Sequence, residues 1–194
     1  MCGGKREPET NCQQLTGQTV PADVVLSGCP VGEAETDRVT LTRVTVRGRL
    51  NLSQQYLKHG LLFHDCHIDD GVDLSWAVCE ELIEFVGCEL GDLHGDNIIA
   101  RKGLSVVDCT LRRVTLAKAQ ITEDLRLSGS TLTHETGALA LHGSDMVIEK
   151  SLRLDDTRPR GRSGSAGGRC PRSPSGRRDW KTRGEWRCAP TRSM

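Results

Sequence analysis

An apolar pattern that returns every 21 or 22 residues constrains the fold of this chain more than any other feature. A period near 20 residues that repeats several times is typical of a solenoid, in which each unit buries its apolar face only against its neighbours. Four positions recur in register between Leu61 and Leu132. The four columns are Leu61, Ile83, Leu104 and Leu125; Phe63, Phe85, Val106 and Leu127; Cys66, Cys88, Cys109 and Ser130; and Ile68, Leu90, Leu111 and Leu132.

The spacing inside each repeat favours strands over helices. An amphipathic helix would place apolar residues three and four apart throughout, whereas here the commonest spacings are two and three. Residues 38–46, RVTLTRVTV, alternate apolar and polar side chains, which indicates a strand with one buried face. A leucine-rich repeat has a similar length, but its LxxLxL frame is absent, so we rank it second.

The segments VRGRLNLSQQYL, GVDLSWAVC, GLSVVDCTL and DLRLSGSTL resemble the pentapeptide-repeat-like proteins of high-GC bacteria. The resemblance covers residues 39–154 and departs from strict fives by one or two extra residues per coil. It implies an all-β fold, a right-handed quadrilateral parallel β-helix, for which we expect about five coils. Relatives of this kind often carry the label of membrane-associated oxidoreductase, but no residue here matches a motif for that chemistry.

The pattern divides the chain into three parts. Residues 1–38 form a polar lead-in, expected to be partly disordered, in which only Val24, Val25 and Leu26 could cap the first coil. Residues 39–156 form the solenoid, interrupted from Thr133 to Gly137 by a segment that we interpret as a corner loop. Residues 157–194 contain no Leu, Ile, Val or Phe, which indicates a disordered basic tail.

Two interpretations of residues 157–194 stay open. Residues 1–156 carry 15 Lys and Arg against 24 Asp and Glu, while the tail carries 11 against 2. The tail is either a disordered or out-of-frame sequence, since GC-rich genes in the wrong frame yield Arg, Gly, Pro, Ser and Trp, or an electrostatic arm for nucleic acid or acidic surfaces. An out-of-frame tail would mean a truncated solenoid, in which Leu152 and Leu154 begin an incomplete sixth coil.

Cysteine usage favours a reducing, cytoplasmic location, with peripheral membrane association left open. The nine cysteines include no CxxC pair and their number is odd, so we expect no disulfide framework. No apolar run approaches the roughly 18 residues of a membrane span. The segment Leu26-Ser27-Gly28-Cys29 resembles a lipoprotein processing site, but no apolar stretch precedes it, so we do not expect lipidation of Cys29.

Candidate chemical sites are few. His64-Asp65-Cys66-His67 holds three zinc-type ligands in four residues, but strand alternation points Cys66 inward and both histidines outward. The repeated cysteines at positions 66, 88 and 109 indicate wall packing, with a soft-metal or redox ladder as the alternative. GxGxxG, Walker and HExxH motifs are absent, so we expect no cofactor and lean against an enzyme.

Two surface features remain. Asp65 to Asp96 contains ten acidic residues and no Lys or Arg, which indicates either a solvated surface or an acidic partner-binding face. Trp76 falls outside the inward pattern beside Val78 and Ile99, which indicates either an apolar patch for self-association or another partner, or the scattered exposure that is equally normal on a protein surface. The candidate acidic face consists of Asp69, Asp70, Asp73, Glu80, Glu81, Glu84, Glu89 and Asp92.

Three functional hypotheses follow. The first is a non-enzymatic β-solenoid scaffold or interaction module for an unknown protein partner, with a homodimer as one form. The second is an acidic DNA mimic that binds a topoisomerase or another nucleic-acid-binding protein, with no direct contact between solenoid and nucleic acid. The third, by family label only, is a membrane-associated oxidoreductase-like protein.

Overall fold

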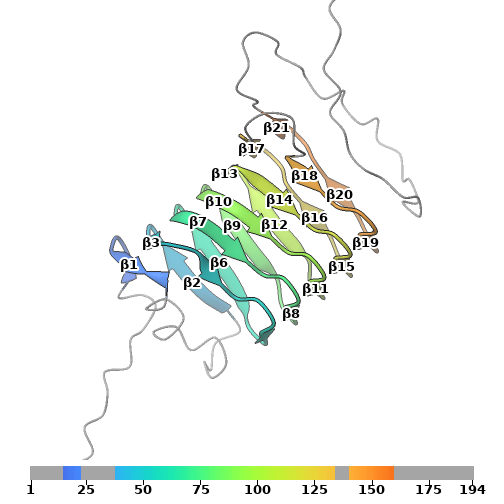
Figure 1. Ribbon diagram of the computed structural model, residues 1–194, viewed down its shortest axis with the longest axis horizontal. Helices are drawn as coiled ribbons and strands as arrows, with labels where there is room; N and C mark the ends of the chain where they lie inside the picture. Colours follow the sequence, from blue (N-terminus) through green and yellow to red (C-terminus); the bar gives the residue numbers. More distant parts are fainter. Residues whose placement is uncertain (1–14, 23–37, 134–139, 160–194) are drawn as a thin grey trace, which may run out of the picture.

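The computed structural model describes residues 15–22, 38–133 and 140–159, and these form a stack of parallel strands. Figure 1 shows the strands stacked in chain order, from β1 at one end to β20 and β21 at the other. Every strand pairs with the strand about one coil away, and all these pairings are parallel. The β-solenoid expected from the repeat is therefore confirmed.

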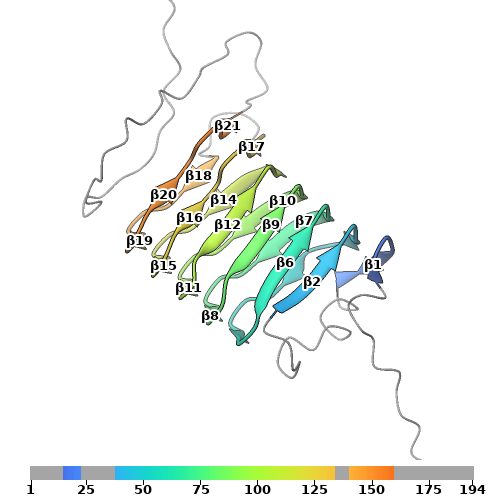
Figure 2. The same cartoon turned by 180° about the vertical axis from the view of Figure 1, so that it is seen from behind.

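Each coil passes along four walls, and the first two are built as follows. The first wall, in front in Figure 2, is a six-stranded sheet. It contains β2 (Arg38–Thr42), β6 (Gly60–His64), β9 (Ile83–Val86), β12 (Leu104–Val107), β16 (Leu125–Arg126) and β20 (Leu152–Arg153). The second wall contains β1 (Thr19–Pro21), β3 (Thr45–Arg47), the first halves of β7 (His67–Asp73) and β10 (Glu89–His94), β13 (Thr110–Leu111), β17 (Thr131–Leu132) and β21 (Arg158–Pro159).

The third and fourth walls complete each coil. Because β7 and β10 bend around the corner between the second and third walls, these two walls join into one ten-stranded sheet. The third wall contains β4 (Leu50–Asn51), the second halves of β7 and β10, β14 (Arg113–Thr115) and β18 (Leu141–His142). The fourth wall is a five-stranded sheet of β5 (Tyr56–Leu57), β8 (Val78–Cys79), β11 (Ile99–Ala100), β15 (Gln120–Ile121) and β19 (Val147–Ile148).

The inward columns form one continuous core between the four walls. Successive Cβ atoms of a strand point to opposite sides, so alternate residues enter the core. Phe63 and Phe85 occupy the same position in adjacent coils, and their rings stack with centroids 4.8 Å apart and planes 11° apart. Both are fully buried, with Leu41 and Val106 next to them along the column. The core is thus built from columns of aliphatic side chains, with a single stacked pair of phenylalanines.

The corners accommodate the residues that break the strict repeat of five. Between the fourth and first walls every coil has three intervening residues, as between Leu57 and Leu61, whereas the corner after the first wall has two. The corner between the second and third walls has three residues in the first two coils and two in the next two. Extra residues therefore enter only at corners, because an insertion within a strand would turn its apolar face outward.

Two corners use a left-handed backbone in nearly every coil. Between the third and fourth walls the chain makes a four-residue turn whose third residue has a positive φ. In the second coil this turn is closed by a hydrogen bond from the Ala77 N–H to the Leu74 carbonyl, at 3.1 Å. Positive φ at the third residue defines a type II turn. The left-handed residues at this corner are Gln54, Trp76, Asn97, Lys118 and Asp145, and those between the first and second walls are Arg43, Asp65, Gly87, Asp108 and Gly129.

Residues 15–22 cover part of the first coil. β1 lies beside β3 with Val20 opposite Val46, and Leu15 and Val20 are only 4% and 7% exposed. The Gly17 N–H donates to the Arg43 carbonyl at 3.0 Å. Part of the polar lead-in therefore continues the core by one partial coil, while residues 24–26, predicted as a cap, lie outside the described residues.

The opposite end carries a partial sixth pass. β20 lies on β16 and β21 lies on β17, so this pass reaches Pro159, beyond the boundary at 156 expected from the sequence. Leu152 and Leu154 are only partly buried against the core. Most of the segment interpreted as a corner loop, residues 134–137, lies outside the described residues, and its flanking strands β17 and β18 belong to the second and third walls.

Replacing Phe85 with Ala should lower the free energy of unfolding by about 3–5 kcal/mol, because the change leaves a cavity beside Phe63 in the column. Urea denaturation followed by circular dichroism measures the loss. Thr110→Ala, at an exposed position of the second wall, should change the free energy by no more than about 0.5 kcal/mol. Equal losses in the two variants would contradict the inward column.

Gly71→Ala should destabilise the protein more than Gly48→Ala, although both glycines turn the same corner with φ of 84° and 86°. An added Cβ at Gly48 meets nothing within 4 Å, so only the left-handed backbone opposes it, at about 1–2 kcal/mol. At Gly71 the new Cβ would collide with the Asp92 backbone of the next coil, adding about 1–3 kcal/mol. Denaturation midpoints of the two variants compare them directly, and identical midpoints would show that the coils do not approach this closely.

Candidate functional site

The eight acidic residues singled out in the sequence do not share one wall. A continuous stretch of about thirty residues winds once and a half around the rod, so its side chains leave it in every direction. The structure places Glu84 on the first wall, Asp69 and Glu89 along the second, Asp73 and Asp92 on the third, Glu80 on the fourth, and Asp70 and Glu81 at corners. They form a belt around the second and third coils.

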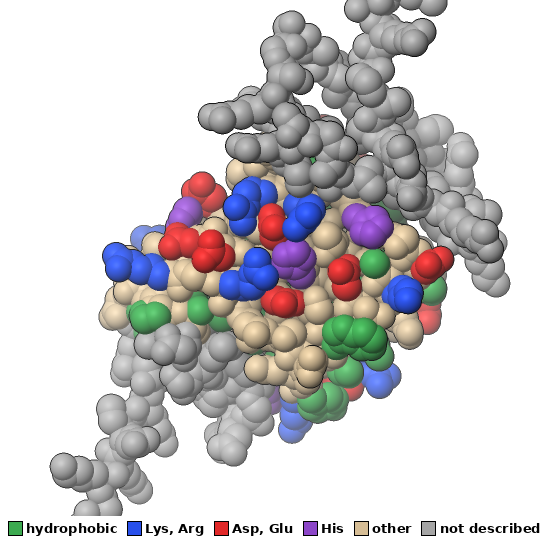
Figure 3. Space-filling view, viewed as in Figure 1, with side chains coloured by type: hydrophobic (Ala, Val, Ile, Leu, Met, Phe, Trp, Pro, Cys, Tyr) green, Lys and Arg blue, Asp and Glu red, His purple; other side chains and the backbone are tan. Residues whose placement is uncertain are grey.

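Several of these carboxylates are paired with arginine side chains from other coils. The closest nitrogen–oxygen distances are 3.0 Å for Arg101–Glu80 and 3.1 Å for Arg113–Asp92. Figure 3 shows the consequence on one face, where acidic, basic and histidine side chains are interleaved. The eight carboxylates therefore do not form one uniformly negative face of the kind that the DNA-mimic hypothesis requires. The remaining arginine pairs are Arg38–Glu84 and Arg112–Asp92, and the His67 ring lies 3.1 Å from the Glu89 carboxylate.

The segment His64-Asp65-Cys66-His67 is split as its alternation predicts. Cys66 is 2% exposed and points into the core, while His64 is exposed and lies 3.1 Å from the Asp65 carboxylate. His67 contacts Asp69 on the outer surface at 2.9 Å. The opposite directions of Cys66 and the two histidines are confirmed. Within residues 15–22, 38–133 and 140–159, no group of three or more His, Cys, Asp or Glu side chains is arranged so that it could hold a metal ion.

The stacked cysteines take part in a hydrogen-bonded column at the corner of the first and second walls. The Cys88 thiol donates to the Phe63 carbonyl at 3.3 Å, and the Cys88 N–H donates to the Cys109 sulfur at the same distance. One coil further, the Ser130 hydroxyl accepts from the Cys109 N–H at 3.2 Å and donates to the Val106 carbonyl. Thiols and hydroxyl thus serve the same purpose, binding backbone groups that the corner leaves unpaired.

The environment of these thiols opposes ionisation. The neighbouring Cys88 thiol and then burial raise the pKa of Cys66, and the Cys109 thiol raises the pKa of Cys88 to about 12. Burial followed by the Glu80 charge raises the pKa of Cys79, on the fourth wall, to about 12. In this chain of bonds only Cys109 has a lowered pKa, because the Cys88 group beside it stabilises its thiolate. Since the nucleophile is the thiolate, the column suits packing better than redox chemistry.

The outer surface of the fourth wall carries an apolar stripe along the rod. Its strands place one outward residue per coil in register, so that Tyr56 lies beside Val78 and Val78 beside Ile99. Tyr56, Trp76 and Val147 are 63%, 61% and 54% exposed, and they are the exposed large hydrophobic residues of the described ranges. All three belong to this wall or its corner. The outer stripe is Tyr56, Val78, Ile99, Gln120 and Val147.

Trp76 stands at the edge of the outer stripe on an unfavourable backbone. Its φ is 64°, a left-handed conformation in which a bulky side chain is uncommon and costs about 1–2 kcal/mol. The equivalent corner positions hold Gln54, Asn97, Lys118 and Asp145 in the other coils, and of these Asn and Asp are the residue types that tolerate this region well. The indole is also exposed, so neither the turn nor the core accounts for a tryptophan here.

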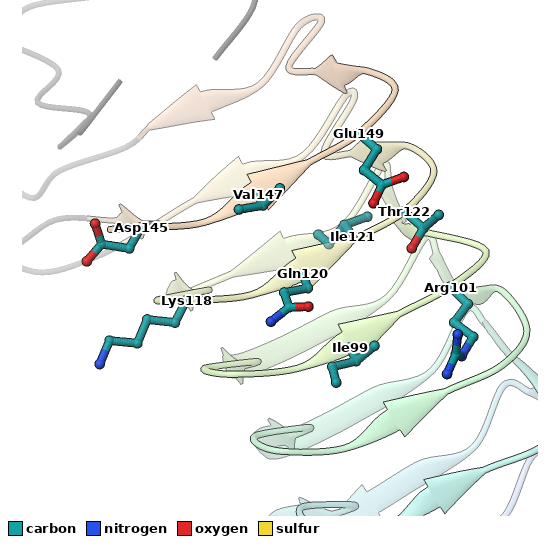
Figure 4. A pocket seen from close by; sticks show the side chains of 9 residues that line it. All are labelled: Ile99, Arg101, Lys118, Gln120, Ile121, Thr122, Asp145, Val147 and Glu149. Atoms are coloured by element: carbon teal, nitrogen blue, oxygen red, sulfur yellow. The ribbon is translucent and has the colours of Figure 1, made fainter. Parts of the chain in front are cut away.

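A shallow hollow lies over the other half of the same wall. Its volume is about 440 Å³, and its floor includes Ile99, Gln120 and Val147. Figure 4 shows Lys118 and Asp145 on one side of it and Arg101, Thr122 and Glu149 on the other. The wall therefore combines protruding aromatic side chains in the first two coils with a charged-rimmed hollow over the last three.

The sequence singled out Trp76, Val78 and Ile99, and the structure brings these three together. It adds Tyr56 and Val147 at the two ends of the outer stripe, which the sequence reasoning missed. The repeat itself contained the signal for these two positions. Tyr56 directly precedes the inward Leu57, and Val147 directly precedes the inward Ile148, so both fall on the outward side of their strands. Comparing outward positions from coil to coil would have found them.

The four described cysteines should resist alkylation in the folded protein, because they are buried and three of them have raised thiol pKa values. Iodoacetamide at neutral pH, with peptide-resolved mass spectrometry, should leave Cys66, Cys79, Cys88 and Cys109 unmodified. The same reagent in urea should modify all four. Rapid labelling of Cys88 in the native protein would contradict the packed column.

No protein-family model matches this chain, and no curated protein or solved structure matches it either. Among the residues that the structure describes, no helix has the length and apolar character needed to cross a bilayer.

Proposed function

We propose that this protein is a β-solenoid interaction module that binds another protein through the outer surface of its fourth wall. One observation carries the proposal: the exposed large hydrophobic residues of the described ranges, Tyr56, Trp76 and Val147, all lie on that wall or at its corner. Figure 3 shows hydrophobic side chains grouped at the lower right, where Figure 1 has the strands of this wall. Contiguous apolar surface rimmed by polar residues is typical of protein-binding sites.

The shape of the surface favours a protein over a small molecule. Small-ligand sites are concave and bury most of the ligand, whereas this hollow lies on the outer surface of the wall, over β11, β15 and β19. Aromatic anchors with a polar rim are the usual composition of a protein interface. Tyr56 and Trp76 supply such anchors, and Lys58, Lys118 and Glu149 supply the rim.

The backbone cost at Trp76 supports the same proposal. Trp76 holds a sparsely populated backbone conformation, although neither core packing nor the turn requires a tryptophan there. Such a residue points to a role other than folding. An asparagine at this corner, as at position 97, would satisfy the turn with less strain. The tryptophan therefore serves a surface role.

The repeat supports a more specific classification as a pentapeptide-repeat-like solenoid. Its inward positions alternate a large apolar residue with a small Cys, Ala or Ser at the corner, as at Phe63 and Cys66 or Leu74 and Ala77. The four cysteines within the described ranges, all buried and free, further support residence in a reducing compartment such as the cytoplasm. Both assignments belong to the proposal.

A photo-crosslinking phenylalanine analogue at Val78, introduced into the full chain in cells, should yield covalent adducts with protein, because Val78 lies at the centre of the apolar surface beside Trp76. The same probe at Thr110, exposed on the second wall, should yield none above background. Gel shifts followed by mass spectrometry measure the adducts. Equal yields from the two positions would contradict the proposal.

Trp76→Asn separates binding from folding in this experiment. The variant should reduce the Val78 adducts several-fold because it removes the indole, yet its thermal unfolding temperature should stay the same or rise, because Asn tolerates φ near 60°. If adducts persist in a folded Trp76→Asn variant, the indole is not part of the binding surface.

A further inference from the structure

We infer that the protein seated on the fourth wall is a second copy of this chain, packed wall to wall with its rod axis antiparallel. The inference rests on the proposed function and adds the identity and orientation of the partner. It comes from the arrangement of the wall, in which shape and charge at one end complement shape and charge at the other.

Three parallel columns cover this wall, with one residue from each coil. The outer stripe runs along the middle, with Ile99 of the third coil at its centre. The turn column beside it is Gln54, Trp76, Asn97, Lys118 and Asp145, and the column on the other side is Lys58, Glu80, Arg101, Thr122 and Glu149. Hydrogen bonds such as that from the Arg101 N–H to the Cys79 carbonyl, at 2.9 Å, keep these columns in register.

A twofold axis parallel to the strands of this wall, through the third coil, brings the first coil of one copy over the fifth coil of the other. Each column then faces its own reversed image. Lys58 meets Glu149, and both are exposed without an ion-pair partner among the described residues. Arg101 meets itself, but each copy of it is already paired with Glu80 at 3.0 Å. The antiparallel arrangement is therefore electrostatically favourable.

The alternative face-to-face arrangement has its twofold axis along the rod, so the rods are parallel. Each coil then faces the same coil, and the turn column faces the column on the other side of the outer stripe. Glu149 would lie opposite Asp145, which places two carboxylates together, and Lys58 would lie opposite the neutral Gln54. Like charges across an interface oppose association, so this arrangement is disfavoured.

Shape leads to the same orientation. The protruding Tyr56 and Trp76 belong to the first two coils, while the hollow of about 440 Å³ lies over the last three. The antiparallel arrangement places Tyr56 over Val147 and Trp76 over Lys118, at the floor and rim of that hollow. The indole face and the Lys118 ammonium then meet as a cation–π pair. The aromatic half of each copy fills the hollow of the other, so the same contact is made twice in the dimer.

The size of the wall sets the strength of this dimer. Five strands about 4.8 Å apart and about five residues wide present roughly 400 Å² of flat surface per copy. Stable interfaces bury about 800 Å² per partner, so the dimer should be reversible, with a dissociation constant in the micromolar range, on the order of 10–100 μM.

Sedimentation velocity of the purified full chain tests this directly. Between about 5 and 300 μM the protein should pass from monomer to dimer. Lys58→Glu and Glu149→Lys should each raise the dissociation constant about tenfold, since each change places like charges together twice per dimer. The double variant, Lys58→Glu with Glu149→Lys, should restore the wild-type value. Arg47→Glu, an exposed charge reversal on the second wall, should leave it unchanged.

A photo-crosslinker at Tyr56 in the purified protein reports orientation. The cross-linked peptide from the second copy should contain Val147 in the antiparallel arrangement and Tyr56 itself in the parallel one. Monomers at every concentration, a dimer that ignores both charge reversals, or Tyr56-to-Tyr56 cross-links would overturn the inference. Adducts with a different protein from Val78 in cells, together with a monomeric purified chain, would retain the proposed function and reject only the second copy.

Discussion

Hydrogen bonds between equivalent backbone positions of successive coils are the constraint on which this structure depends. The Asp65 N–H donates to the Val86 carbonyl at 2.9 Å, and the Gly87 N–H donates to the Val107 carbonyl at 3.0 Å. Because every such bond joins residues about one repeat apart, each inward side chain must lie over its equivalent in the next coil. No coil is stable alone, since its apolar residues are covered only by its two neighbours. Variation in length is consequently confined to corners, where an added residue does not reverse the inward and outward alternation of a strand.

This constraint explains which features the sequence alone predicts. A repeated inward position such as Phe63 and Phe85 follows from the period and the alternation of the strands, and Cys66 and His64 separate for the same reason. The partial coil of residues 15–22 could not be predicted, because Leu15 and Val20 lack the full repeat and are held by backbone bonds to the first coil. A polar segment can add a strand to a parallel sheet when its backbone N–H and C=O groups form hydrogen bonds with the exposed edge strand.

Surface features require the three-dimensional register and are therefore harder to infer from the chain in order. The acidic stretch looked continuous along the sequence, yet the winding of the coil distributes it over all walls and beside cations such as Arg101 and Arg113. Tyr56 and Val147 are separated by 91 positions in the sequence and lie at the two ends of one stripe. In a solenoid, residues one period apart are neighbours, whereas residues ten apart can face opposite directions.

The symmetry of the proposed contact also determines how far assembly can proceed. A wall that meets its own reversed image forms an isologous interface, which is saturated at two copies, whereas a contact between the two unlike ends of the rod would add further copies without limit. The fourth wall offers the first kind of contact because Ile99 stands at the midpoint of the outer stripe and faces itself. Packing through this wall leaves the edge strands β1 and β20 uncovered. Pairing of two rods side by side therefore does not depend on the addition of further strands at the ends of the rod. In the proposed pair the exposed indole of Trp76 enters the hollow of the second copy, a contact that each copy makes once and that favours a closed pair over an open stack.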